Sequence, residues 1–87
     1  MTRWSRTTAG WAANLDGTDA ALGFSLPRVE VRSSPRGWQS ACFLADGRQT
    51  EWTAPYPGGS AAAMADALAH FRRLVGAGPL AAPSRIG

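Results

Sequence analysis

The sequence predicts an α+β domain in which an antiparallel sheet of three to five strands packs against one C-terminal helix. Two observations predict it: apolar and charged residues alternate in residues 28–32, the first strand of a meander over residues 28–53, and an apolar stripe at helical spacing runs through residues 60–76. The stripe and the apolar side of the strands each need a partner, and a two-layer arrangement lets them bury each other. We expect one domain over residues 1–76, with residues 1–10 loosely attached and residues 77–87 a flexible tail.

The strands of residues 28–53 are predicted to form a three-stranded meander. The clearest strand is Arg28-Val29-Glu30-Val31-Arg32, because its two valines fall on one face and its three charged residues on the other. Residues 33–37 have the composition of a turn, and residues 38–44 form the next strand. Asp46-Gly47 then favours a tight turn, since both residue types tolerate a positive φ. Residues 49–53 are expected to pair back along residues 38–44.

Residues 11–26 allow two interpretations. The preferred one is a hairpin, because residues 11–15 alternate in polarity and Asp16-Gly17 favours a two-residue turn. The returning strand would carry apolar residues at every second position, namely Ala20, Leu22, Phe24 and Leu26. The alternative is a single helical turn over residues 18–22.

The helix is predicted over residues 60–76. Ser60 is a residue type that caps a helix N-terminus through its hydroxyl, and Gly76 or Gly78 is expected to end the helix. The apolar stripe comprises Met64, Leu68, Phe71 and Val75, with Ala61, Ala67 and Leu74 at its margins. We expect this stripe to pack on Val29, Val31 and alternate residues of the strand over 38–44.

No residue pattern indicates catalysis, a metal site or a cofactor site. The only cysteine, Cys42, lies in an apolar run that predicts burial, and the only histidine, His70, is expected on the exposed side of the helix. A nucleophile needs a neighbouring base, a metal needs clustered ligands, and the sequence groups neither. Gly58-Gly59 before the helix lacks the lysine of a phosphate-binding loop. We expect a non-catalytic protein with no cofactor, no metal and no small-molecule substrate.

The charge pattern permits an anionic partner without requiring one. All nine basic residues are arginine, and the net charge is +3. No apolar stretch approaches the roughly 18–20 residues that span a bilayer, and the first residues lack the apolar segment of a secretory signal. These features predict a cytoplasmic protein that does not bind membranes.

Several aromatic and basic residues are candidates for binding a partner. Tryptophan and arginine are enriched at interaction hot spots, and the chain has four tryptophans. Trp38 and Trp52 are expected to share a sheet face, either in the core or in an interface. Trp4 lies outside any periodic segment and is expected to be exposed or to become ordered on a partner. The candidate partner-binding residues are Arg3, Trp4, Arg28, Arg32, Arg36, Arg48 and Tyr56.

Residues 29–75 resemble the arm-type DNA-binding module at the N-terminus of tyrosine recombinases. The matching features are Gly37-Trp38-Gln39-Ser40-Ala41-Cys42-Phe43, then Asp46-Gly47-Arg48, then an alanine-rich helix over residues 61–68. The resemblance implies a three-stranded meander with a helix, and DNA binding through the sheet. The chain departs from the family at Gln49-Thr50-Glu51, where basic residues are typical, and in the extra loop Pro55-Tyr56-Pro57-Gly58-Gly59.

Two functions follow from these observations. The favoured one is a small protein-binding module, an accessory subunit or an inhibitor of a larger macromolecular machine of the kind that mobile elements encode. The alternative is a nucleic-acid-binding domain that uses arginines on a sheet face. The first is favoured because the charge excess is small and because Glu30 and Glu51 lie within the candidate basic surface.

Overall fold

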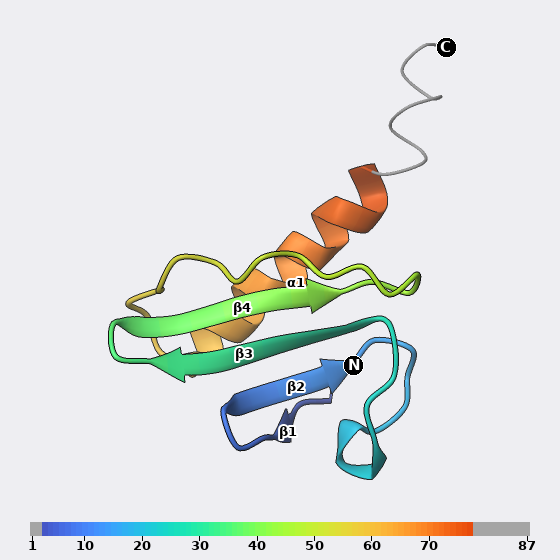
Figure 1. The fold of residues 1–87 in the computed structure, drawn as a ribbon, viewed down its shortest axis with the longest axis horizontal. Helices are drawn as coiled ribbons and strands as arrows, with labels where there is room; N and C mark the ends of the chain where they lie inside the picture. The colour runs from blue at the N-terminus through green and yellow to red at the C-terminus, as the bar shows by residue number, and fades with distance from the viewer. Residues whose placement is uncertain (1–2, 78–87) are drawn as a thin grey trace.

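A computed structural model describes residues 3–77 and shows one antiparallel sheet with one α-helix packed across it (Figure 1). The strands are β1 (Ser5–Arg6), β2 (Gly10–Asn14), β3 (Arg28–Ser34) and β4 (Gly37–Phe43), in the order β1-β2-β3-β4. A short 3-10 turn, η1 (Ala20–Leu22), lies between β2 and β3, and the helix α1 (Ser60–Ala77) comes last. The predicted α+β class, with a sheet and a C-terminal helix, is confirmed.

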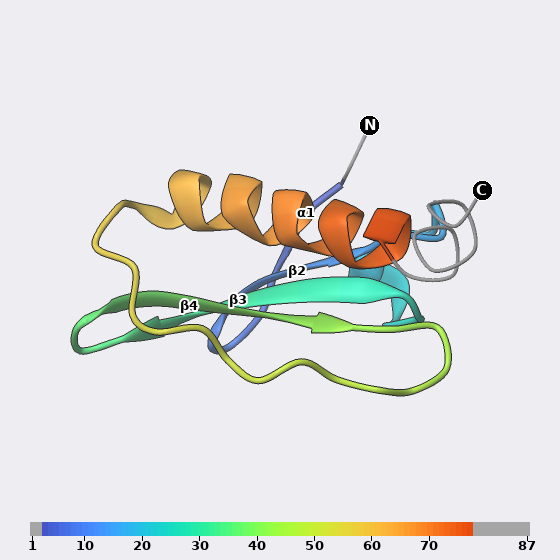
Figure 2. The same ribbon diagram turned by 90° about the horizontal axis from the view of Figure 1, so that it is seen from above.

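The two valines of β3 lie at the centre of the core. Val29 is opposite Ala13 of β2 and Cys42 of β4, and Val31 is opposite Trp11 and Ser40. Both valines are buried beneath α1, which covers one face of the sheet in Figure 2. The charged residues of β3 point to the other face, as the alternation predicts. We call that other face, turned away from α1, the open face.

The helix packs through its small residues. Ala63 and Ala67 are buried against the valines, whereas Val75 is 53% exposed. The prediction that placed Val75 in the buried stripe and Ala67 at its margin is therefore wrong. The buried face of the helix is rotated by part of a turn towards Ala63 and Ala67. Small side chains let the helix axis approach the sheet closely, so larger residues of the helix also reach the core. These larger residues are Met64, Leu68, Phe71 and Leu74.

The ends of the helix differ slightly from the prediction. The amide of Ala63 donates to the carbonyl of Gly59 at 3.1 Å, so Gly59 occupies the capping position and Ser60 is the first helical residue. The helix continues through Gly76 to Ala77, the last residue described. The predicted tail therefore lies outside the described residues except for Ala77. His70 is half-buried and not exposed as expected.

Residues 49–53 follow β4 without forming the predicted third strand of the meander. The amides of Thr50 and Thr53 donate to the carbonyls of Cys42 and Ser40 at 2.9 and 3.0 Å. In the other direction, the amides of Cys42 and Ser40 donate to the hydroxyls of Thr50 and Thr53 at 2.9 and 3.1 Å. Threonine side chains thus take the place of backbone carbonyls, which covers the edge of β4 without a regular ladder.

The N-terminal half also differs from the preferred prediction. Asp16-Gly17 does turn the chain, with Gly17 at φ +94°, but residues 20–26 do not return along β2. One edge of β2 pairs with β3 and the other with β1, so neither is free for a returning strand. The alternative of a helical turn is closer, since η1 begins after Asp19. Residues 1–10 were expected to be loose, but β1 joins the sheet within them.

Candidate functional site

The predicted binding residues do not form one surface. Arg36 lies in the turn between β3 and β4, and Arg48 lies in the turn that follows β4 at the opposite end of the sheet. Arg28 and Arg32 project from the open face, where both are only partly exposed. Arg3 is exposed beside β1 and lies 3.4 Å from Asp19.

Arg28 is enclosed by intramolecular contacts. Its guanidinium lies 4.4 Å from the ring centroid of Phe43 and 5.2 Å from that of Phe24, so it is flanked by two aromatic rings. Its Nε also donates to a carboxylate oxygen of Glu30 at 2.7 Å. Only 20% of the side chain is exposed, which leaves little of it to meet a partner.

Arg32 is held in a similar way. Its guanidinium stacks on Trp52 at 4.0 Å, and its Nε donates to the side-chain oxygen of Gln39 at 3.0 Å. Arg32 and Gln39 are opposite each other on the open face, so Trp52 covers that face. Trp38 packs instead against the core beneath α1. The prediction that the two tryptophans share a face is therefore wrong.

The two remaining aromatic candidates contribute to the fold. Trp4 is half-buried and packs against the core, which corrects the expectation that it is exposed. Tyr56 is exposed, but its backbone forms an isolated bridge with Trp38, with both hydrogen bonds made. A side chain at Gly37 would collide with the carbonyl oxygen of Tyr56, so the backbones of these two residues lie in close contact.

The connection between β2 and β3 is held by a buried asparagine. The side-chain amide of Asn14 donates to the carbonyl of Gly23 at 2.9 Å and to the hydroxyl of Thr18 at 3.0 Å. Its side-chain oxygen accepts from the amide of Ser25 at 3.0 Å. Asp16 accepts further bonds from the amide and hydroxyl of Thr18. Because Asn14 is 4% exposed and its polar atoms are paired within the loop, the loop conformation is strongly specified.

This well-held loop displays large apolar side chains. Leu22 is 89% exposed, Phe24 is 55% exposed and Leu26 is 38% exposed. We call residues 20–26 the apolar loop. A single exposed leucine is ordinary, but three large exposed apolar residues on one short, hydrogen-bonded loop are unusual.

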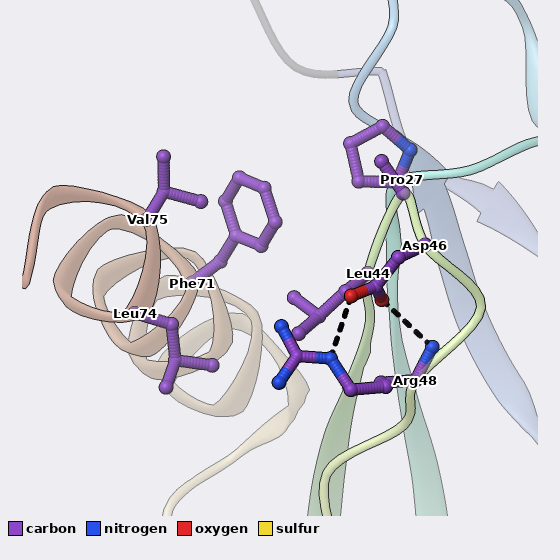
Figure 3. A pocket seen from close by; sticks show the side chains of 8 residues that line it. Pro27, Leu44, Asp46, Arg48, Phe71, Leu74 and Val75 are labelled. Atoms are coloured by element: carbon purple, nitrogen blue, oxygen red, sulfur yellow. Dashed lines mark hydrogen bonds and ion pairs between the residues drawn. The ribbon is translucent and has the colours of Figure 1, made fainter. Parts of the chain in front are cut away.

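A groove lies at the same end of the sheet. It has a volume of about 620 Å³ and opens between the last turns of α1 and the turn that follows β4. Figure 3 shows Phe71, Leu74 and Val75 of the helix on one side, with Leu44 and Pro27 across from them. Its rim includes two charged residues, Arg48 and Asp46. The Nε of Arg48 donates to a carboxylate oxygen of Asp46 at 2.6 Å.

The apolar loop and the groove lie at the same end of the sheet, and we call this end of the molecule the apolar end. They are continuous along the chain, since Leu26 directly precedes Pro27, and Figure 2 shows the connection and the last turn of α1 at the same end of the sheet. Sequence reasoning did not predict this surface, because Leu22, Phe24 and Leu26 occupy every second position, as apolar residues do on the buried face of a strand. The signal against a strand was Asp19, which accepts from the amide of Ala21 and starts η1.

The described residues include one cysteine, Cys42, and one histidine, His70. Cys42 is buried as predicted, and its burial raises the pKa of the thiol, so the thiol stays protonated. Within residues 3–77, no three histidine, cysteine or acidic side chains lie close enough to hold a metal ion. In that same stretch, no helix is long and apolar enough to cross a bilayer.

Comparisons of this chain with protein-family models, with curated proteins and with solved structures find no match. The resemblance to arm-type modules therefore stays a prediction from the sequence.

Proposed function

We propose that this chain is a small non-catalytic protein-binding module of the cytoplasm, an accessory subunit or an inhibitor of a larger assembly, and that it docks through the apolar end. The observation that carries the proposal is the exposure of Leu22, Phe24 and Leu26 on a loop whose conformation is set by Asn14. A protein surface with a complementary apolar patch is the partner that these side chains suit.

The energetics favour such an interface. Full burial of one leucine or phenylalanine side chain contributes about 1.5–3 kcal/mol, so Leu22 and Phe24 can supply a large share of a binding free energy. The loop is already ordered by its hydrogen bonds, so docking costs little further conformational entropy. The groove at the same end of the sheet offers further space for apolar side chains of a partner.

Nucleic-acid binding through the open face is supported less well. Arg28 and Arg32 would have to leave their aromatic and polar partners before they could contact phosphates. If Arg28, Arg32, Arg36 and Arg48 did bind duplex DNA, three or four phosphate contacts would give a log–log salt slope of roughly −3. We expect no submicromolar binding of duplex or single-stranded DNA at about 0.15 M salt, where exposed charges are screened over about 8 Å.

The proposal is tested by capture from nuclease-treated lysate of the source cells. We expect the wild-type chain to retain a specific protein, and Leu22→Asp to lose it, because a charge replaces an apolar anchor. The matched control is Ala61→Asp, which adds the same charge at an exposed site in the first turn of α1. Retention of the protein by Leu22→Asp, or capture that disappears with nuclease treatment, would refute docking through the apolar end.

A further inference from the structure

A row of three residues crosses the open face next to the apolar loop. Asn14 of β2, Arg28 of β3 and Phe43 of β4 are directly opposite one another in the register of the sheet. Side chains at opposite positions lie on the same face, with Cβ atoms about 4.5–5.5 Å apart. The row lies where β3 begins, and only Pro27 separates Arg28 from the apolar loop along the chain. Its members are therefore placed to hold that loop.

Two members of the row hold different parts of Phe24. The side-chain amide of Asn14 donates to the carbonyl of Gly23 at 2.9 Å, and its side-chain oxygen accepts from the amide of Ser25 at 3.0 Å. Asn14 thus fixes the backbone on both sides of Phe24. The guanidinium carbon of Arg28 lies over the ring of Phe24, 5.2 Å from the ring centroid. A guanidinium within about 6 Å of a ring centroid attracts the ring, so Arg28 holds the side chain.

Arg28 is itself a fixed group. The third member of the row, Phe43, has its ring centroid 4.4 Å from the same guanidinium carbon. The Nε of Arg28 donates to a carboxylate oxygen of Glu30 at 2.7 Å, and charge-assisted hydrogen bonds of this kind are among the stronger ones. Only 20% of the Arg28 side chain is exposed, whereas Phe24 is 55% exposed. Phe24 is therefore an exposed aromatic residue that rests on a well-held cation.

We propose that Arg28 is a positioning residue that fixes the ring of Phe24, and that Phe24 is the anchor of the surface through which this chain docks. The inference rests on the proposed function, because it concerns the same apolar loop. Leu22 is 89% exposed, and an exposed side chain exchanges between rotamers, so a partner has to order it on binding. The ring of Phe24 is ordered beforehand, which lowers the entropic cost of burying it.

The first test needs no partner, because it measures the side-chain order of Phe24 in the full chain. Three-bond NMR couplings report the χ1 angle of this residue. We expect the wild-type couplings to indicate one rotamer and those of Arg28→Ala to be averaged over several. The amide of Ser25 should remain protected from exchange in Arg28→Ala, because its bond to Asn14 is unchanged. This combination distinguishes loss of the ring position from loss of the loop.

The matched control is Arg32→Ala. It truncates the same residue type on the same strand and the same face, but the guanidinium of Arg32 stacks on Trp52. Phe24 should therefore keep one rotamer in Arg32→Ala. Phe71 packs against the core on the other side of the sheet, so unchanged couplings of Phe71 show that the fold is retained in both variants.

The second test is a double-mutant cycle. Binding is measured as the amount of protein retained from nuclease-treated lysate over a series of concentrations of the chain. Arg28→Ala should weaken binding by roughly 2- to 10-fold, the cost of ordering one side chain. Phe24→Leu keeps an apolar side chain but removes the ring, so Arg28→Ala should cause no further loss in that background. In a Leu22→Ala background, Arg28→Ala should have its full effect.

Two results would overturn the positioning role of Arg28. They are a single rotamer of Phe24 in Arg28→Ala, and losses of binding that add in the double variant of Arg28 and Phe24. Docking through the apolar loop would survive either result if Leu22→Asp still loses the captured protein. Capture of no protein by the wild-type chain would instead remove the proposed function and the anchor together, while the couplings would still decide whether Arg28 fixes the ring.

Discussion

The helix-covered face of the sheet and the apolar end are both built from apolar residues, but the first is buried and the second is exposed. On the covered face, Val29 and Val31 are buried beneath Ala63 and Ala67. At the apolar end, Leu22 is almost fully exposed on a loop that polar groups hold in place. We therefore expect the stability of the domain to depend on the first region, and the proposed contact with a partner to depend on the second. Substitutions in the two regions should separate stability from binding.

The largest effect on stability is expected at the covered face. Val29→Ala should lower the free energy of unfolding by about 2 kcal/mol, because it removes buried methyl groups and leaves a cavity. Leu22→Ala should change it by less than about 0.5 kcal/mol, because the side chain is already exposed to water. Urea denaturation measures both values. Equal losses in the two variants would mean that the apolar loop belongs to the core.

An intermediate effect is expected at Asn14, which connects the two regions. Asn14→Ala leaves the carbonyl of Gly23 and the amide of Ser25 without their partners and should cost about 1 kcal/mol. It should also abolish partner capture, because the apolar loop loses its fixed conformation. The control is Ser25→Ala, which removes a hydroxyl bonded to Thr18 but keeps the backbone bond to Asn14. Full binding by Asn14→Ala would contradict a preformed loop.

The smallest effect is expected from the titration of Asp16 in the same connection. The hydroxyl of Thr18 donates to this carboxylate and, with the amide of Thr18, lowers its pKa below the ordinary 3.8. A lowered pKa in the folded state means that the contact stabilises the fold above pH 3.8 and is lost as pH falls through the folded value. Thr18→Ala should move the pKa back towards 3.8, as measured by NMR titration of the carboxyl group.

Acidification should also separate the two regions. Below the pKa of Asp16, amide exchange should rise in residues 16–25 before it rises at Val29 and Val31, whose bonds involve no carboxylate. An unchanged Asp16 pKa in Thr18→Ala, or loss of the core and the loop together in acid, would show that the connection is not held as described.

The sequence by itself determined the elements whose signals are local. Alternation of valine with charged residues located β3, and the turn at Asp46-Gly47 followed from a residue pair that tolerates positive φ, with Gly47 at +92°. The start of the helix was located within one residue, since Ser60 is its first residue and Gly59 its cap. Burial of Cys42 followed from its apolar neighbours. In each case neighbouring residues carry enough information, because backbone preference and side-chain periodicity act over a few positions.

Only the tertiary structure decided the features that depend on competition between distant segments. Whether residues 20–26 form a strand depends on which segment pairs with β2, and both of its edges are taken by β1 and β3. Whether residues 49–53 form a ladder depends on Thr50 and Thr53, whose hydroxyls replace carbonyls as acceptors for β4. The candidate binding arginines were assigned to the surface by their charge, yet Arg28 and Arg32 stack on aromatic rings far away in the sequence. The apolar end was not predicted, for the same reason. Apolar residues at every second position give the same sequence pattern in a buried strand and in an exposed loop, and only the tertiary packing distinguishes the two.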